Sequence, residues 1–267
     1  MTATESTRMP DTNGFPQGYF VIRSLASENP VRVLDVCANY TKDGAEIILY
    51  AEKEKYLVDN RRNPEANNQV FFVDDTGALC SRSSGHAIDI EGDQLVLRHR
   101  RPLAHPYPNC HSHPLPKFVY SPKTGEISVH FSCDPSYPWS SSDSAEWKNK
   151  TYLLASVPLR KPKGLMDDIS TALQSPLNLF GGSHAQKRAT LEEMANRGID
   201  LAEDEVLEEE RGEEAEVDDS PELMRKVRMI TTTKRTEDDH GLLEKAKNRR
   251  QWEVVSIRTA DARTGGI

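Results

Sequence analysis

The chain has no run of about 18 apolar residues, so it contains no predicted membrane-spanning helix. Its first residues have neither the basic start nor the apolar stretch of a secretory signal peptide, and we therefore expect a cytoplasmic or nuclear location. No two cysteines form a Cys-x-x-Cys pair, so we expect thiols and no disulfides at Cys37, Cys80, Cys110 and Cys133.

Apolar residues are scarce as well. They make up 36% of the chain and the mean hydropathy is -0.66, which predicts that part of the chain lies outside the core. Acidic residues are concentrated in residues 192–222, which contain fifteen Asp and Glu but only two Arg. That segment carries a net charge of -13 against -8 for the whole chain, which leaves +5 for the remainder. A block of acid repels phosphate, so we expect no nucleic-acid partner.

Residues 17–159 contain short apolar runs separated by turns and almost no helical periodicity. This pattern is typical of an all-β sandwich or barrel. The predicted strands are residues 19–23, 31–36, 46–51, 70–74, 78–81, 87–90, 95–98, 118–121, 126–131, a weak one at 137–139, and 152–158.

An aromatic residue opens a short β-branched run at Phe71 and Phe118, and each run continues through a glycine turn into another strand. Eleven predicted strands in sets of four leave one strand missing, and it should begin with an aromatic. Trp252 provides this strand, since a sheet without it keeps open edges with unpaired amide groups. The alternative is that Trp252 begins an unrelated C-terminal strand or helix end.

Residues 160–248 are therefore predicted to form an insertion in the third repeat, and residues 249–260 to complete the fold. Apolar residues at helical spacing predict helices at about 165–173 and 189–210, the second with a narrow apolar stripe and an acidic face. Residues 212–222 and 231–241 resemble linkers. We expect disorder in part of the insertion, in residues 1–16 and in residues 261–267.

The segments RVLDV, DGAEIILYAE and NNQVFFVDDTGALCS, with three sets of four strands each closed by an aromatic, resemble the ricin-type β-trefoil lectins. The resemblance covers residues 17–159 and 249–258, and it implies an all-β fold of three four-stranded repeats. In that family each repeat carries a Gln-x-Trp motif, and Gln69-Val70-Phe71 looks like it with Phe in place of Trp.

The resemblance implies a sugar site in the first repeat. Asp35 would accept hydrogen bonds from sugar hydroxyls, Tyr50 would stack on the sugar ring, and Asn68 before Gln69 would complete the hydrogen bonding. A carboxylate and an amide make directional bonds to hydroxyls, and an aromatic ring offers a flat apolar surface. Ile48 stands where lectins often have a Gln, so one polar contact is lost. Alternatively, Asp35 caps its loop and Gln69 orders the chain through backbone hydrogen bonds.

The other two repeats depart further from the family. The second keeps Asp89 but has Arg98 in place of the stacking aromatic and Leu115-Pro116 in place of the amides. In the third, Asp134 is out of register and only Gln251 precedes Trp252. At most one sugar site is therefore predicted, which implies weak monovalent binding.

Other chemistry has less support. The loop His105-Pro106-Tyr107-Pro108-Asn109-Cys110-His111-Ser112-His113 could supply zinc ligands, but its spacing fits no standard site and we predict no metal and no cofactor. Ser83, Ser84 and His86 lie close in sequence without a third member or an oxyanion hole. Gly181-Gly182 follows a predicted helix instead of opening one after a strand, as a phosphate-binding loop would. We therefore expect a non-enzyme.

Two functions remain. One is a lectin-like, carbohydrate-binding module, in which Asp35→Ala should abolish glycan binding. The other is an intracellular protein-interaction scaffold that uses the trefoil and the acidic helical insertion at 165–210, or a coiled-coil partner helix, without binding sugar. Membrane contact through Leu165, Ile169, Leu173 and Phe180 is opposed by the neighbouring Asp167 and Asp168, which anionic lipid repels.

Overall fold

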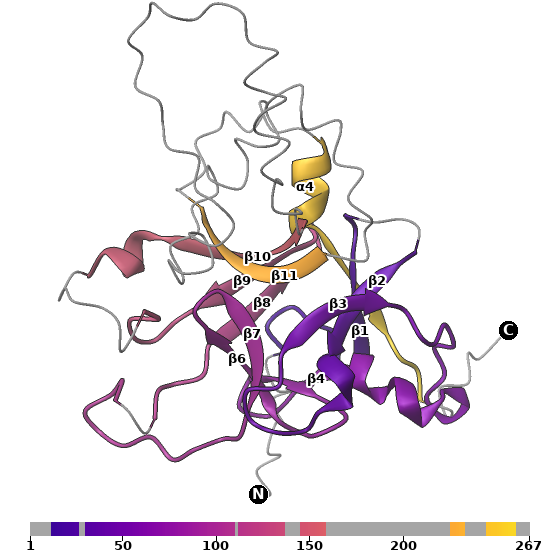
Figure 1. The fold of residues 1–267 in the computed structure, drawn as a ribbon, viewed down its shortest axis with the longest axis horizontal. Coiled ribbons are helices and arrows are strands. Elements are labelled where there is room, and N and C mark those ends of the chain that lie inside the picture. Colours follow the sequence, from indigo (N-terminus) through magenta and orange to yellow (C-terminus); the bar gives the residue numbers. More distant parts are fainter. Residues whose placement is uncertain are drawn as a thin grey trace, which may run out of the picture.

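A computed structural model describes residues 12–26, 30–109, 112–136, 145–158, 225–232 and 244–259. Twelve strands form three sets of four (Figure 1). The first set is β1 (Phe20–Ser24), β2 (Arg32–Val36), β3 (Ile47–Ala51) and β4 (Phe71–Val73). The second is β5 (Leu79–Ser81), β6 (Ala87–Glu91), β7 (Gln94–Arg98) and β8 (Lys117–Ser121). The third is β9 (Glu126–His130), β10 (Thr151–Pro158), β11 (Arg225–Thr232) and β12 (Trp252–Ser256).

The strands pair by the same rule in each set. The second strand pairs antiparallel with both the first and the third, as β2 does with β1 and β3. The same holds for β6 with β5 and β7, and for β10 with β9 and β11. Fourth strands join the sets, since β4 pairs with β1 and β5, and β12 pairs with β1. Three hairpins, β2–β3, β6–β7 and β10–β11, therefore cap a barrel of first and fourth strands. The predicted β-trefoil is confirmed.

The three hairpins are fastened to one another by backbone hydrogen bonds. The amide of Leu97 donates to the carbonyl of Ala45 over 2.8 Å, and the amide of Gly44 donates back to the carbonyl of Leu97 over 2.9 Å. The amide of Met229 donates to the carbonyl of Asp93 over 2.8 Å, and the carboxylate of Asp93 accepts from Arg228 over 3.2 Å. Both charged side chains are largely buried, so the third hairpin is held to the second by a shielded ion pair.

The aromatic residues that open the fourth strands fill the core, as predicted. Phe71 and Phe118 are fully buried and Trp252 is 1% exposed, and all three belong to one apolar cluster with residues from every repeat. The indole N–H of Trp252 donates to the carbonyl of Leu154 over 3.1 Å, which satisfies its only polar atom.

The closing strand was predicted correctly, but the bounds of the insertion were wrong. Ser256 to Trp252 pair antiparallel with Phe20 to Ser24, so β12 closes the fold. The predicted insertion at 160–248 contains β11, which pairs with β10 along its whole length, and the helix α4 (Glu244–Arg250), which contacts β10 and β1. Thr231 and Thr232 end β11 and are not a linker. The insertion therefore lies between β10 and β11.

β11 was missed because its composition hides its pattern. The segment Arg-Lys-Val-Arg-Met-Ile-Thr-Thr alternates, with Val227 and Met229 buried in the main core and basic residues between them. The strand predicted as third in its set, β10, is in fact the second, and β11 takes the third place. The weak strand expected at residues 137–139 lies outside the described residues.

The N-terminal segment corrects a second expectation, since part of residues 1–16 is ordered. Phe15 is 3% exposed, belongs to the main core and stacks on Phe20 with ring centroids 5.2 Å apart. Gly14 adopts a φ of +82°, and a Cβ there would lie 2.0 Å from the carbonyl oxygen of Tyr120. Only glycine permits this close approach, which brings Phe15 into the barrel.

The structure also shows short helices and free cysteines, and some predicted segments lie outside the described residues. Four 3₁₀ helices occur in the described chain, at Cys37–Asn39, Asp59–Arg61, Pro64–Gln69 and Ala145–Asn149. Cys37, Cys80 and Cys133 are free thiols, while Cys110 lies outside the described residues. The predicted helices at 165–173 and 189–210 and the tail at 261–267 also lie outside them. None of the described helices has the length and apolarity needed to cross a membrane.

Candidate functional site

The site predicted in the first repeat centres on a buried carboxylate in β2. Leu34 and Val36 point into the main core, so Asp35 between them points to the opposite face of the strand. Its side chain is only 3% exposed. A buried carboxylate is stable only when its oxygens accept hydrogen bonds, and here they accept from three side chains.

Two of these partners come from the amide pair that precedes β4. The 3₁₀ helix Pro64–Gln69 carries them to Asp35, and Asn63 caps its start by accepting from the amide of Glu65. Asn68 donates to Oδ1 of Asp35 over 2.8 Å and Gln69 donates to Oδ2 over 2.9 Å. Both amides are fully buried.

Gln69 also orders the chain, as expected. Its amide nitrogen donates to the carbonyl of Ala51, and its oxygen accepts from the backbone amide of Lys53, both over 2.9 Å. The backbone following β3 is therefore fixed against the segment preceding β4. This places the side chain of Lys53 over the cluster.

Lys53 is the third partner, and sequence reasoning missed it. Its ammonium lies 2.9 Å from Oδ2 of Asp35 and 3.1 Å from the side-chain oxygen of Asn68. These are the two acceptors that the resemblance assigns to sugar hydroxyls. The only signal in the sequence is a basic residue three positions after Tyr50, which has no meaning until the chain folds back.

Tyr50 completes the group at the surface. Tyr50 pairs with Val33 and Ile48 pairs with Asp35, so Tyr50 and Asp35 are diagonal neighbours on one face of the β2–β3 hairpin. The ring is 50% exposed, and the ammonium of Lys53 lies 5.4 Å from its centroid. The structure therefore brings Asp35, Tyr50, Asn68 and Gln69 together, with Lys53 between the polar groups and the aromatic ring.

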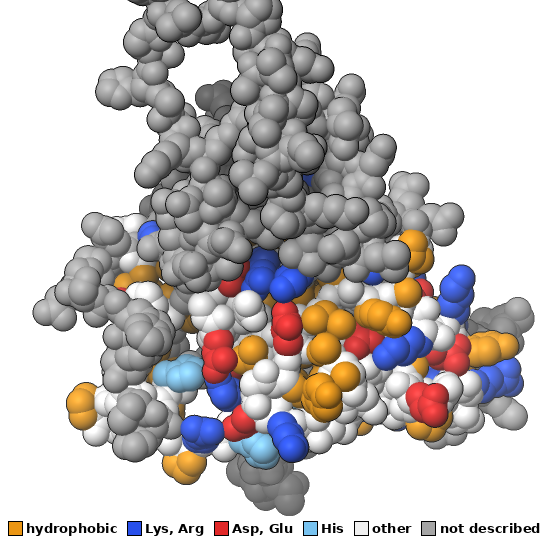
Figure 2. Space-filling view, in the orientation of Figure 1, with side chains coloured by type: hydrophobic (Ala, Val, Ile, Leu, Met, Phe, Trp, Pro, Cys, Tyr) orange, Lys and Arg blue, Asp and Glu red, His pale blue; other side chains and the backbone are white. Residues whose placement is uncertain are grey.

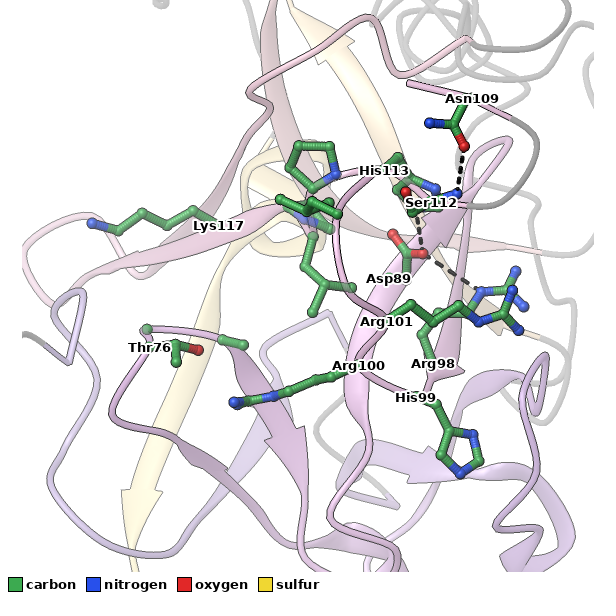
Figure 3. Close-up of a pocket in the computed structure, with 16 residues that line it drawn as sticks. Thr76, Asp89, Arg98, His99, Arg100, Arg101, Asn109, Ser112, His113 and Lys117 are labelled. Carbon is green, nitrogen blue, oxygen red and sulfur yellow. Dashed lines mark hydrogen bonds and ion pairs between the residues drawn. The ribbon is translucent and has the colours of Figure 1, made fainter. Parts of the chain in front are cut away.

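The second repeat keeps the carboxylate but surrounds it with cations. Asp89 pairs with Val96 in the β6–β7 hairpin, the same position that Asp35 holds opposite Ile48. Its Oδ2 lies 2.7 Å from Nε2 of His113 and 3.6 Å from Nε of Arg98, and Figure 3 shows it between these two side chains. Leu115, where the first repeat has an amide, packs instead on an apolar cluster.

Asp89 lines a cavity of about 720 Å³ that is bordered by the loop carrying His113. Basic side chains at its rim are paired: Arg98 with Glu91, Arg100 with Asp74, and Arg101 with Asp43. Figure 2 shows the same mixture on one face of the molecule, where basic and acidic side chains lie next to each other.

The hydrogen bond that the ring of His113 donates to Asp89 raises the pKa of His113, although burial opposes the change. His113 therefore carries a proton more readily than an ordinary histidine, and its charge is matched by the carboxylate. No sequence signal indicates this pair, because its members lie 24 residues apart.

The third repeat lacks the elements of a sugar site. Leu154 of β10 pairs with Met229 of β11, and both are fully buried, as are Leu34 and its equivalents. The next residue, Ala155, therefore stands where Asp35 stands in the first repeat, and Ile230 stands where Tyr50 does. Neither can make the contacts of a carboxylate or of an aromatic ring.

Four of the five described histidines lie in two regions of the structure, and His130 in β9 lies apart from both. In the loop at 105–113, His113 bonds to Asp89 and the ring of His105 packs on Tyr107, with centroids 4.6 Å apart. Elsewhere, His86 packs on His99 beside Asp43, and Ser84 accepts from the backbone amide of His86 and not from its ring. Burial, followed by the neighbouring imidazole of His99, lowers the pKa of His86.

Comparisons with known proteins find similar solved structures but no family. No protein-family model and no curated protein matches the chain. Among solved structures, it resembles the C-terminal half of an earthworm R-type lectin in complex with GalNAc, at 12% identity and a TM-score of 0.38, over 90% of this chain and 99% of that one. It also resembles the β-trefoil lectin of the Vibrio vulnificus hemolysin/cytolysin with N-acetyl-D-lactosamine bound, at 18% identity and a TM-score of 0.33, over 53% of this chain and 80% of that one.

A third similar structure is the mdaA-1 domain, at 15% identity and a TM-score of 0.42, over 96% of this chain and 98% of that one. These neighbours include an R-type lectin and another β-trefoil lectin. At such identities and TM-scores, the likeness transfers no ligand and no site to this chain.

Proposed function

We propose that the protein is a non-catalytic, lectin-like module that binds carbohydrate weakly through one site in its first repeat. The observation that carries the proposal is the cluster of Asp35, Asn68 and Gln69 next to the half-exposed ring of Tyr50. Directional acceptors beside a flat apolar ring are the groups that a sugar requires, because a sugar has hydroxyls at its edge and C–H groups on its face.

Lys53 gives a physical reason for weak binding. Its ammonium bonds to Asp35 and to Asn68, so a sugar hydroxyl can reach these acceptors only by displacing it. The side chain is 35% exposed, so it can turn into solvent. Sugar binding thus competes with an ion pair that is partly exposed, which is worth about 0.2–1 kcal/mol. The same movement of Lys53 uncovers the face of the Tyr50 ring, because its ammonium lies over that ring, 5.4 Å from the centroid.

The first test is a heteronuclear NMR titration of the full chain with a panel of simple sugars. We expect saturable shifts confined to Asp35, Tyr50, Lys53, Asn68 and Gln69. Tyr50→Ala should remove these shifts while the fold survives, since the ring is half exposed and lies outside the core clusters.

The variant Lys53→Met tests whether the Lys53 ammonium competes with the sugar or helps to bind it. Met keeps an apolar stem without the ammonium, so sugar affinity should rise by about two- to fivefold if the ion pair competes with the ligand. Lys55→Met is the matched control, because it removes the same charge from an exposed position two residues away and should leave affinity unchanged. A loss of affinity in Lys53→Met would mean that the ammonium itself binds the sugar.

The absence of shifts at millimolar sugar, in both the wild type and Lys53→Met, would contradict the carbohydrate function. The scaffold function would then be tested by deleting residues 165–210 and measuring partner association.

A further inference from the structure

Three side chains that can ligate metal ions converge where the first repeat meets the second. Asp43 lies between β2 and β3, His86 directly precedes β6 and His99 directly follows β7. One ligand atom from each lies within 4.8 Å of the ligand atoms of the other two. Within the described residues, no other group of three or more His, Cys, Asp or Glu side chains converges in this way.

The backbone pairing explains why the two histidines meet. Ala87 pairs with Arg98 at the end of the β6–β7 hairpin, so residues 86 and 99 are the next pair outward. Their ring centroids are 3.8 Å apart. His99 points away from Asp89 and His113 (Figure 3), but the two groups are neighbours, because His99 also lines the cavity and Arg101 at its rim bonds to Asp43.

The third ligand is positioned by the contact between hairpins. The Gly44 amide bonds to the Leu97 carbonyl, which fixes the turn that carries Asp43 against β7. Oδ1 of Asp43 accepts from the backbone amide of His99 over 2.6 Å and lies 2.6 Å from its ring Nδ1. Oδ2 accepts from Arg101 over 2.9 Å. The carboxylate is therefore held in place before any ion arrives.

A buried nitrogen in this group has no partner in the described chain. Nδ1 of His86 is shielded from solvent and makes no hydrogen bond. Burying a polar atom without a partner is unfavourable, and such atoms in a native fold call for an explanation. A bound cation accounts for it, because a neutral imidazole offers a lone pair to a metal.

We propose that Asp43, His86 and His99 bind a divalent transition-metal ion of the zinc type. Two imidazoles and one carboxylate are ligands that Zn²⁺ prefers, and three protein ligands leave a fourth position for water. The side chain of His99 is 60% exposed, so this position faces solvent. The ion would join the turn before β3 to the β6–β7 hairpin, and it would therefore stabilise the junction between two repeats.

The test uses the full chain after treatment with a chelator and desalting. Zn²⁺ is titrated by calorimetry and Co²⁺ by visible absorption, which reports a tetrahedral ligand field. We expect one equivalent of either ion to bind. Because even outer-shell substitutions weaken metal binding by about 10- to 100-fold, loss of a direct ligand in His99→Gln should weaken it by at least about 100-fold. The fold should survive, since this side chain is mostly exposed.

His130→Gln and His105→Gln are the controls. His130 is exposed in β9 and its ring contacts the Ser128 hydroxyl, whereas His105 belongs to the histidine-rich loop. Both variants should bind Zn²⁺ like the wild type. Failure of the wild type to bind either ion would overturn the proposal, as would unchanged binding by His99→Gln or a loss confined to His105→Gln. Sugar titrations depend on other residues, so this failure leaves the carbohydrate proposal standing.

Discussion

Asp35 and Asp89 occupy the same position in successive repeats, yet their surroundings differ. Asp35 is held by two buried amides and a lysine, and the exposed ring of Tyr50 lies beside it. Asp89 is held by His113 and Arg98 at the wall of a cavity. Each carboxylate is placed by its own hairpin. Arg98 belongs to the hairpin of Asp89, whereas the two amides, Lys53 and His113 arrive from segments that follow the hairpins. The trefoil places a carboxylate at the same position in both repeats, and the side chains that surround this carboxylate decide its chemistry.

The largest expected effect tests whether the first and second repeats contribute equally to the stability of the core. Phe71 and Phe118 are both fully buried in the main core. Phe71→Ala and Phe118→Ala should therefore each lower the free energy of unfolding by about 3–5 kcal/mol, because each removes a large apolar side chain and leaves a cavity. Urea denaturation of both variants measures this. A much smaller loss in one variant would show that the two repeats do not support the core equally.

The next effect compares how much Asp35 and Asp89 each contribute to the free energy of unfolding. Asp35→Ala leaves a buried donor of Asn68 and one of Gln69 without a partner, so we expect a loss of about 2–4 kcal/mol. Asp89→Ala should cost less, about 1–2 kcal/mol, because the partly exposed His113 can bond to water and Arg98 keeps Glu91, so that the Ile90 amide is the one buried donor that loses this acceptor. Urea denaturation compares them, and equal losses would contradict the comparison. For this reason Tyr50→Ala tests sugar binding more cleanly than Asp35→Ala.

The smallest effect is a pH dependence from the Asp89–His113 pair of the second repeat. The pKa of His113 is raised above 6.5 by its bond to Asp89, with burial and the charges of Arg98 and Arg101 opposing. Its stabilising contribution is therefore complete below the unfolded pKa and is lost as the pH rises through the folded pKa. The side chain is 41% exposed, so we expect less than about 1 kcal/mol.

Urea denaturation of the wild type and of His113→Gln, repeated at pH values below the unfolded pKa and above the folded pKa of His113, measures the stabilisation by this ion pair. The stability difference between them should shrink as the pH rises. A difference independent of pH would show that the histidine is held by packing and not by its charge.

The fold was predictable because its signals are local. Short β-branched runs, glycine turns and the buried aromatics Phe71, Phe118 and Trp252 mark the repeats. Where local signals were weak, prediction failed: basic residues hid the alternation of β11, and the polar residues around Phe15 hid its place in the core. The missed strand moved the boundary of the insertion, because the third repeat needs a hairpin partner for β10.

The sequence by itself determined the aromatic core positions and most of the strand pattern, and its resemblance to the lectins grouped Asp35 with Tyr50, Asn68 and Gln69. Only the tertiary structure decided that Lys53 lies on Asp35, that His113 bonds to Asp89, and that Asp43 meets His86 and His99. Each of these contacts joins side chains from different strands or loops. Their positions depend on how hairpins and loops pack, and no spacing along the chain encodes that packing.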